Sequence, residues 1–158
     1  MRRVRIPEPT LAAELENVLE TFQWVRDQVY RRNGVRKEQI SLLRRAIAES
    51  GGLSQDKFRE QTGLHADTAS RAASFICHKD RQWARSQAGA KDRRVQFIIA
   101  TPKGLTFIES LDRQVEEAFF STLGVGSDSK RAARIAEKVK KLNEELDDFI
   151  RRQASLYT

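Results

Sequence analysis

The sequence predicts a mainly α-helical fold that carries one small β-hairpin. Apolar residues recur at helical spacing towards both ends of the chain, and Gly or Pro residues separate the helical segments. The stretch 91–104, KDRRVQFIIATPKG, differs, because four charged residues lead into a β-favouring run that ends at Thr101 and Pro102. It predicts a charged turn, a strand and a helix start, since Thr101 can cap a helix whose first residue is Pro102.

The composition predicts one basic globular domain. The chain of 158 residues can bury a core, and 39% hydrophobic with 32% charged residues is not a disordered composition. The net charge of +7 favours a polyanionic partner, and nucleic acid is favoured over an acidic membrane surface.

The single Cys77 excludes an intramolecular disulfide framework. We expect a cytoplasmic protein with no membrane partner, because no long apolar run follows the basic start or occurs elsewhere.

Two helices are predicted before residue 52. The first runs from Thr10 to about Tyr30 and ends at the Asn33–Gly34 turn. Its apolar residues, spaced by three and four, form a seam: Leu11, Leu15, Val18, Phe22, Val25 and Val29. The second runs from Arg36 to Ser50, and its residues Ile40, Leu43 and Ile47 are expected to face the core.

The next two predicted helices match a helix-turn-helix. Ser54 can cap a short helix anchored by Phe58, and Gly63 supplies the positive φ at its end. A helix from residue 65 or 66 to about His78 follows, with a small apolar side of Ala69, Ala72, Ala73 and Ile76. In a helix-turn-helix this second helix lies in the DNA major groove. Its opposite side carries candidate DNA contacts, of which Arg71 is the strongest: His65, Asp67, Ser70, Arg71 and Ser74. The alternative is that these helices are only a compact packing unit.

The hairpin is predicted to pair Arg81–Gln87 with Val95–Thr101 across the turn 88–94. The segment 57–94 holds nine Lys or Arg against four acids, so it carries +5 of the net +7. A charge run is often only a solvated face, but this one coincides with the predicted helix-turn-helix and hairpin. The candidate DNA contacts of the hairpin are Arg85, Lys91, Arg93 and Arg94.

Two long helices are predicted after the hairpin. The first runs from Pro102 to about Leu123 with an inward face of Leu105, Ile108, Leu111, Val115 and Phe119. The last, from about Asp128 to Arg152, is roughly 40 Å long, too long to lie wholly on a small core. Its seam and that of the first helix predict a homodimer. The expected interface is Leu11, Leu15, Val18, Phe22, Ile135, Val139, Leu142, Leu146 and Phe149. The alternative is that the two seams pack on each other within a monomer.

The order of these elements resembles that of a winged helix-turn-helix of the MarR family of transcription regulators. Asp92-Arg93-Arg94, a strand, then Ala100-Thr101-Pro102-Lys103-Gly104 resembles the family's wing signature, D-x-R, strand, L-T-x-x-G. The run 68–71, TASR, is similar to the T-V-T-R of its recognition helix, which adds Thr68 to the candidates. The resemblance implies one MarR-like domain over 1–158, with a DNA-binding part at 36–101 and N- and C-terminal dimerisation helices at 10–30 and 102–153.

The resemblance also implies roles for the wing residues. Arg94 would enter the minor groove or grip a phosphate, and Asp92 would brace the wing arginine or the recognition helix through an ion pair. The alternative for Asp92 is a turn residue that accepts hydrogen bonds from its own backbone.

Three positions depart from the family pattern. Residues 78–81, HKDR, replace the usual Gly before the wing, and Ala100 replaces Leu. Arg59 stands where Ala is usually buried, so either that helix is rotated or the stem of Arg59 packs with its charge in solvent.

Signals for catalysis are nearly absent. Two His and one Cys cannot build an ordinary zinc site, and the glycines at 124 and 126 follow a helix, unlike a phosphate loop. Trp24 and Trp83 are interpreted as packing residues. Cys77 is interpreted as an ordinary half-buried thiol, and a redox sensor is the less favoured alternative. We therefore expect no enzyme, no metal and no cofactor, while a small-molecule effector stays open.

The hypothesis is a homodimeric, sequence-specific regulator of transcription that binds double-stranded DNA as a repressor. The alternatives are architectural or plasmid or phage maintenance DNA binding, or a winged-helix module for protein partners.

Overall fold

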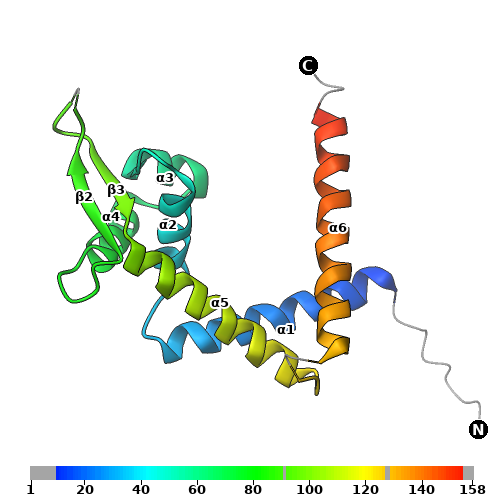
Figure 1. Cartoon of the computed structure of the whole chain (residues 1–158). Coiled ribbons are helices and arrows are strands. Elements are labelled where there is room, and N and C mark those ends of the chain that lie inside the picture. The colour runs from blue at the N-terminus through cyan, green and yellow to red at the C-terminus, as the bar shows by residue number, and fades with distance from the viewer. Residues whose placement is uncertain (1–9, 91, 127–128, 155–158) are drawn as a thin grey trace, which may run out of the picture. The chain divides into compact units, whose positions relative to one another are not determined.

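A computed structural model describes residues 10–90, 92–126 and 129–154, and Figure 1 shows its helices and strands. The elements in order are α1 (Leu11–Arg32), α2 (Lys37–Ala48), β1 (Leu53–Ser54), α3 (Gln55–Thr62), α4 (Ala66–Ile76), β2 (Ala84–Ala88), β3 (Gln96–Ala100), α5 (Pro102–Thr122) and α6 (Lys130–Ala154). This confirms the mainly α fold with a small hairpin. The chain divides into two compact units between Val115 and Glu116, within α5.

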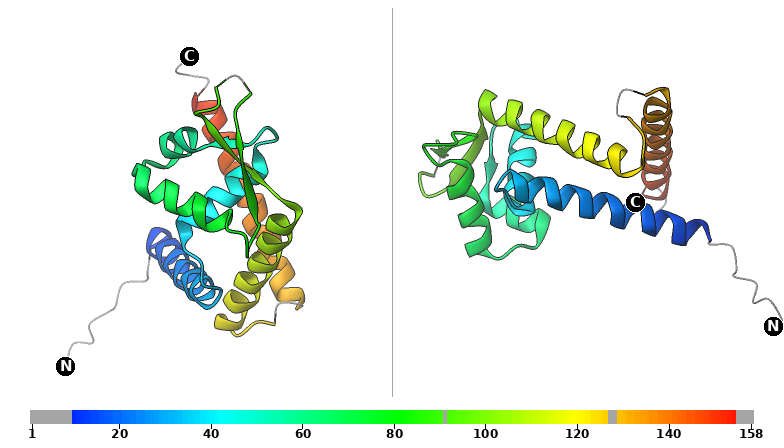
Figure 2. Two further views of the ribbon diagram at one scale, coloured as in Figure 1. Left: turned by 90° about the vertical axis from the view of Figure 1, so that its left-hand side faces the viewer. Right: turned by 90° about the horizontal axis from the view of Figure 1, so that it is seen from below.

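The first unit contains a small antiparallel sheet in the order β1-β3-β2. The hairpin of β2 and β3 extends beyond the neighbouring helices (Figures 1 and 2). In the central strand β3, Ile98 is opposite Leu53 of β1 and Ser86 of β2. Sequence analysis missed β1, which has only two residues. Gly52, at φ +86°, turns the chain towards β3, and a Cβ there would lie 2.8 Å from the Ile99 side chain.

Helices α2, α3 and α4 pack beside this sheet around one core. The largest fully buried side chains come from nearly every element of the unit: Ile40, Leu42, Leu43, Leu53, Phe58, Ile76, Ile98 and Leu111. Phe58 is the buried anchor of α3, as predicted, and Gly63 ends this helix at φ +68°. The hydroxyl of Ser54 accepts a hydrogen bond from the backbone N–H of Lys57 at 3.2 Å, which confirms the predicted cap.

Helix α5 begins as predicted but buries a different first residue. The Thr101 hydroxyl accepts a hydrogen bond from the Gly104 N–H at 3.2 Å. The expected inward residue Leu105 is 44% exposed, so that expectation is wrong. The buried stripe starts instead at Gly104, which lies against the backbone of Trp83, and continues at i+4, i+7 and i+11 with Ile108, Leu111 and Val115.

The first wing strand starts at Ala84, three residues later than predicted. Residues 77–83 instead form turns at the end of α4. The N–H of Arg81 donates to the carbonyl of His78 at 2.9 Å, and that of Trp83 donates to the carbonyl of Ile76 at 3.1 Å. Gln82 has a positive φ of 55°. Because these backbone donors are already used, pairing with β3 begins only at Ala84, opposite Ala100.

The second unit holds the end of α5 and α6. Phe120, Val125 and Ala132 form its buried cluster, and Ile135 packs against them. The Ser129 hydroxyl accepts a hydrogen bond from the N–H of Ala132 at 3.1 Å and so caps α6. The predicted start of this helix at Asp128 lies outside the described residues.

Candidate nucleic-acid interface

Helix α4 presents one polar face and buries the opposite one. Its small apolar side, Ala69, Ala72, Ala73 and Ile76, is buried against α2 and α3. On the other side, the structure leaves exposed five of the six predicted contact residues, His65, Asp67, Ser70, Arg71 and Ser74, and leaves Thr68 half-buried. Alanines on the buried side allow close approach of the neighbouring helices, so the polar face is held rigidly at the surface.

Two of these residues are restrained in different ways. His65 is the N-cap of α4, but its side chain makes no capping hydrogen bond. The imidazole is therefore not committed to the helix end. Arg71 Nε donates to the backbone carbonyl of Asp67 at 3.2 Å, so this side chain lies back along its own helix. It must exchange that bond to reach a partner.

The wing has a tight tip that carries exposed arginines. The N–H of Gly89 donates to the carbonyl of Val95 at 2.8 Å, and a Cβ at Gly89 would lie 2.8 Å from the carbonyl oxygen of Asp92. Arg85, Arg93 and Arg94 are all exposed. Lys91, also predicted as a contact, lies outside the described residues.

Asp92 makes a turn contact at the wing tip. Its Oδ1 accepts a hydrogen bond from the backbone N–H of Arg94 at 2.9 Å. This is the contact expected of the turn-forming alternative. No ion pair joins Asp92 to an arginine in the described part of the wing, and the ion-pair brace stays a prediction. The observed bond still restricts the backbone from which Arg94 projects.

An aromatic and cationic cluster joins α4, the wing and α5. The rings of Trp83 and Phe107 stack at a centroid distance of 3.8 Å. The guanidinium of Arg81 lies over the Phe75 ring at 3.6 Å. The Thr101 hydroxyl donates to the carbonyl of Gln82 at 2.6 Å. Trp83 is thus a packing residue, as interpreted, but sequence analysis missed the cluster, because its members come from four separate segments with no common spacing.

Arg59 keeps its charge at the surface. Its guanidinium donates to Oδ1 of Asp56 at 3.2 Å, and its side chain is 43% exposed. The charge of Arg59 is therefore not buried where the related pattern has Ala.

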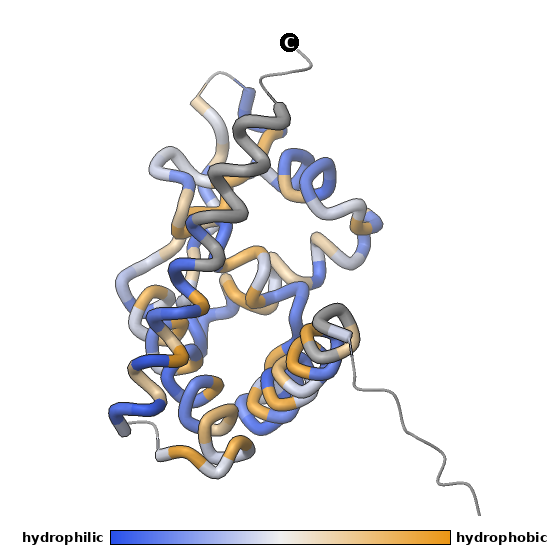
Figure 3. Tube along the Cα trace, turned by 90° about the vertical axis from the view of Figure 1, so that its right-hand side faces the viewer, coloured by the Kyte–Doolittle hydropathy of each residue, from blue (hydrophilic) through white to orange (hydrophobic). Residues whose placement is uncertain are grey.

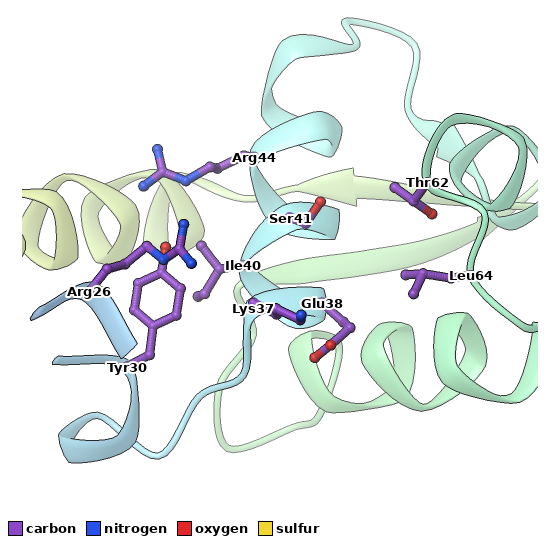
Figure 4. Close-up of a pocket in the computed structure, with 9 residues that line it drawn as sticks. All are labelled: Arg26, Tyr30, Lys37, Glu38, Ile40, Ser41, Arg44, Thr62 and Leu64. Atoms are coloured by element: carbon purple, nitrogen blue, oxygen red, sulfur yellow. The ribbon is translucent and has the colours of Figure 1, made fainter. Parts of the chain in front are cut away.

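A pocket of about 450 Å³ lies beside α2 (Figure 4). Its lining comes from α1, α2, the last residue of α3 and the turn before α4: Arg26, Tyr30, Lys37, Glu38, Ile40, Ser41, Arg44, Thr62 and Leu64. Partial burial acts to lower the pKa of Arg44, but the hydrogen bonds and negative charge of Asp112, with a smaller contribution from Tyr30, outweigh it and raise this pKa. Arg44 is thus a permanent cation at the pocket wall.

The predicted dimer seam is largely exposed where its side chains are described. Hydrophobic segments recur along α1 (Figure 3). Leu15 and Val18 are each 52% exposed, Phe22 is 37% exposed and, on α6, Val139 is 61% exposed. Ile135 is partly buried within its own unit. The side chains of Leu11, Leu142, Leu146 and Phe149 lie outside those described.

Three further features concern metal binding, membrane spanning and thiol chemistry, each among the described residues. Within residues 10–90, 92–126 and 129–154, no cluster of His, Cys, Asp and Glu could hold a metal ion. No helix in the same ranges is long and apolar enough to cross a membrane. Cys77 is half-buried, and this burial raises the pKa of its thiol.

Comparison with solved structures identifies the fold. A mutant of MepR from S. aureus bound to an oligodeoxyribonucleotide aligns at a TM-score of 0.61 and 18% identity, over 87% of this chain and 99% of that one. YusO from Bacillus subtilis aligns at 0.62 and 18%, over 83% and 90%. A MarR-family transcriptional regulator from Rhodococcus sp. RHA1 aligns at 0.57 and 16%, over 85% and 94%. No protein-family profile and no curated protein matches the sequence. The chain has a MarR-like winged-helix fold.

Proposed function

We propose that the protein is a sequence-specific, double-stranded-DNA-binding transcription regulator that acts as a homodimer and represses by occluding a promoter. One observation carries the proposal: α4 exposes a polar face while the adjacent wing exposes three arginines, Arg85, Arg93 and Arg94. A rigid polar helix of this kind suits the edges of bases in the major groove, and arginines suit phosphates or a narrow minor groove. The structurally similar MepR mutant is bound to an oligodeoxyribonucleotide, which supports DNA as the partner.

The exposed seam supports the homodimer. Leu15 and Val18 lie in a row of apolar residues on α1 that a second copy could cover. A two-fold dimer would present two copies of α4 to half-sites about 34 Å apart, one turn of the DNA helix. The expected operator is therefore a pseudo-palindrome.

The experiment that tests the proposal is a footprint of the purified protein on DNA from around its own gene, combined with binding titrations at several salt concentrations. A regulator should protect a discrete pseudo-palindromic site, with a steep linear fall of log affinity against log salt concentration. Protection of any sequence would point to an architectural role. A flat salt dependence without a footprint would leave only a protein-binding module.

The wing contribution can be tested by Arg94→Ala. If Arg94 binds a phosphate or the minor groove, the variant should bind DNA more weakly and lower the salt slope by about one for each phosphate that is no longer neutralised. Arg134→Ala removes the same charge from an exposed position on α6 and serves as the matched control. Equal affinities of the two variants at two salt concentrations would remove the wing tip from the proposed interface.

A further inference from the structure

A second basic surface lies outside the helix-turn-helix and wing. The turn between α1 and α2 has the sequence RRNGVRK over residues 31–37, and all four of its cations are exposed: Arg31, Arg32, Arg36 and Lys37. The longer segment 31–45 holds six Lys or Arg against the single acid Glu38. The net charge of residues 31–45 is therefore +5, the same as that of residues 57–94. None of the residues in 31–45 was predicted to bind a partner.

The turn that carries these cations is well ordered by hydrogen bonds. Asn33 Nδ2 donates to the carbonyl of Val29 and to Oε1 of Gln114 on α5, each at 2.9 Å. Gly34 supplies a positive φ of 65°, and Val35 is buried at 4% exposure. The four cations, which lie within seven residues of one another in the chain, are thus carried on a fixed backbone.

Favourable interaction with a helix dipole accounts for only two of these four cations. Arg31 and Arg32 lie in the last turn of α1, where positive charge favours the helix dipole. Arg36 and Lys37 are the N-cap and first residue of α2, where positive charge is unfavourable. In the described part of the chain, neither of them forms an ion pair that would offset this cost. Their position therefore points to a negative group outside the protein.

The turn lies near the recognition helix. Lys37 lines the same pocket as Leu64, the residue directly before the N-cap of α4 (Figure 4). Helix α2, which begins at the turn, packs directly against α4. Figures 1 and 2 place the C-terminal end of α1 at the end of the first unit where α4 lies. A DNA duplex on α4 would bring its phosphates towards this turn.

We propose that the α1–α2 turn, through Arg36 and Lys37, is a second phosphate-binding surface that extends the DNA interface beyond α4 and the wing. This inference rests on the proposed function and adds a binding surface to it. Its chemistry is sequence-independent, because ammonium and guanidinium groups neutralise backbone phosphates and release counterions without reading bases.

The test compares two double variants that lose the same charge. Arg36→Gln with Lys37→Gln removes the proposed phosphate-binding cations, while Arg134→Gln with Lys141→Gln removes two exposed cations of α6. Affinity for the footprinted duplex and for an unrelated duplex is measured by fluorescence anisotropy across a salt series. We expect the first variant to bind both duplexes on the order of tenfold more weakly at low salt, with a slope reduced by about one for each phosphate that is no longer neutralised. The α6 variant should change both quantities less.

Two further measurements keep the outcomes distinct. The charge-preserving variant Arg36→Lys with Lys37→Arg should bind within about twofold of wild type, because backbone phosphates accept a contact from either cation. Thermal melts report whether each variant is folded. Wild-type DNA binding together with equal losses of affinity in the turn and α6 variants would overturn this inference alone. A wild-type protein that binds no DNA would overturn the proposed function as well.

Discussion

Replacing Gly104 by alanine should destabilise the protein, although alanine is ordinarily the better helix residue. A Cβ at this position would overlap the carbonyl oxygen of Trp83 and lie 2.9 Å from its carbonyl carbon and 3.1 Å from Leu43 Cδ1. Two of these neighbours are backbone atoms, which cannot rotate away as a side chain can. The chain must therefore move α5 away from the segment that leads into the wing.

The free-energy terms have opposite signs, and their sizes decide the result. Overpacking costs about 1–3 kcal/mol, and weakening the 3.0 Å hydrogen bond from Thr101 N–H to the Trp83 carbonyl costs about 1 kcal/mol more. The better helix propensity of alanine returns up to about 1 kcal/mol. The expected net loss of about 1–3 kcal/mol corresponds to a fall in Tm of roughly 3–10 °C for a chain of this size.

Circular dichroism melts of Gly104→Ala and Gly51→Ala provide the test. An added Cβ at Gly51 meets no atom within 4 Å, so this control should stay within about 0.5 kcal/mol of wild type. A Tm of the Gly104 variant equal to or above that of wild type would show that the close approach to Trp83 is wrong.

Three other changes test separate parts of the molecule. Phe58→Ala should cost about 3–5 kcal/mol in urea unfolding, because a fully buried aromatic anchor is removed; a cost below about 1 kcal/mol would contradict its role in the core. Leu15→Glu with Val18→Glu should shift sedimentation from dimer to monomer, since two carboxylates cannot be buried unpaired in an apolar interface; an unchanged distribution would place the interface elsewhere. Cys77 should react with iodoacetamide more slowly than a free thiol at neutral pH, and its rate should rise at a higher pH, because a raised pKa lowers the thiolate fraction; a rate equal to that of free cysteine would contradict its burial.

The helices and turns could be predicted from local sequence because each depends on neighbouring residues. Ser54, Gly63 and Thr101 act as predicted, since a cap needs a hydroxyl beside free N–H groups and a left-handed helix end favours Gly. The polar face of α4 follows from alanines at helical spacing on its other side. The DNA-binding residues proposed on that face stay predictions, because their chemistry depends on a partner.

The features that sequence analysis missed are tertiary. The two-residue strand β1 has no periodicity of its own and exists because Gly52 lets the chain approach β3. The wing starts later than predicted because the backbone after α4 is occupied by turns. Leu105 is exposed because the neighbouring Gly104, which has no side chain, is the residue that faces Trp83.

By itself, the sequence determined the helical order, the basic character of 57–94 and the resemblance to a winged helix, because spacing, charge and turn chemistry are local properties. The tertiary structure alone decided which surfaces those elements share. It joined Phe75, Trp83 and Phe107 at the base of the wing and set the α1–α2 turn beside the residue that precedes the N-cap of α4. Such neighbours are distant in the chain, and only packing of the core brings them together.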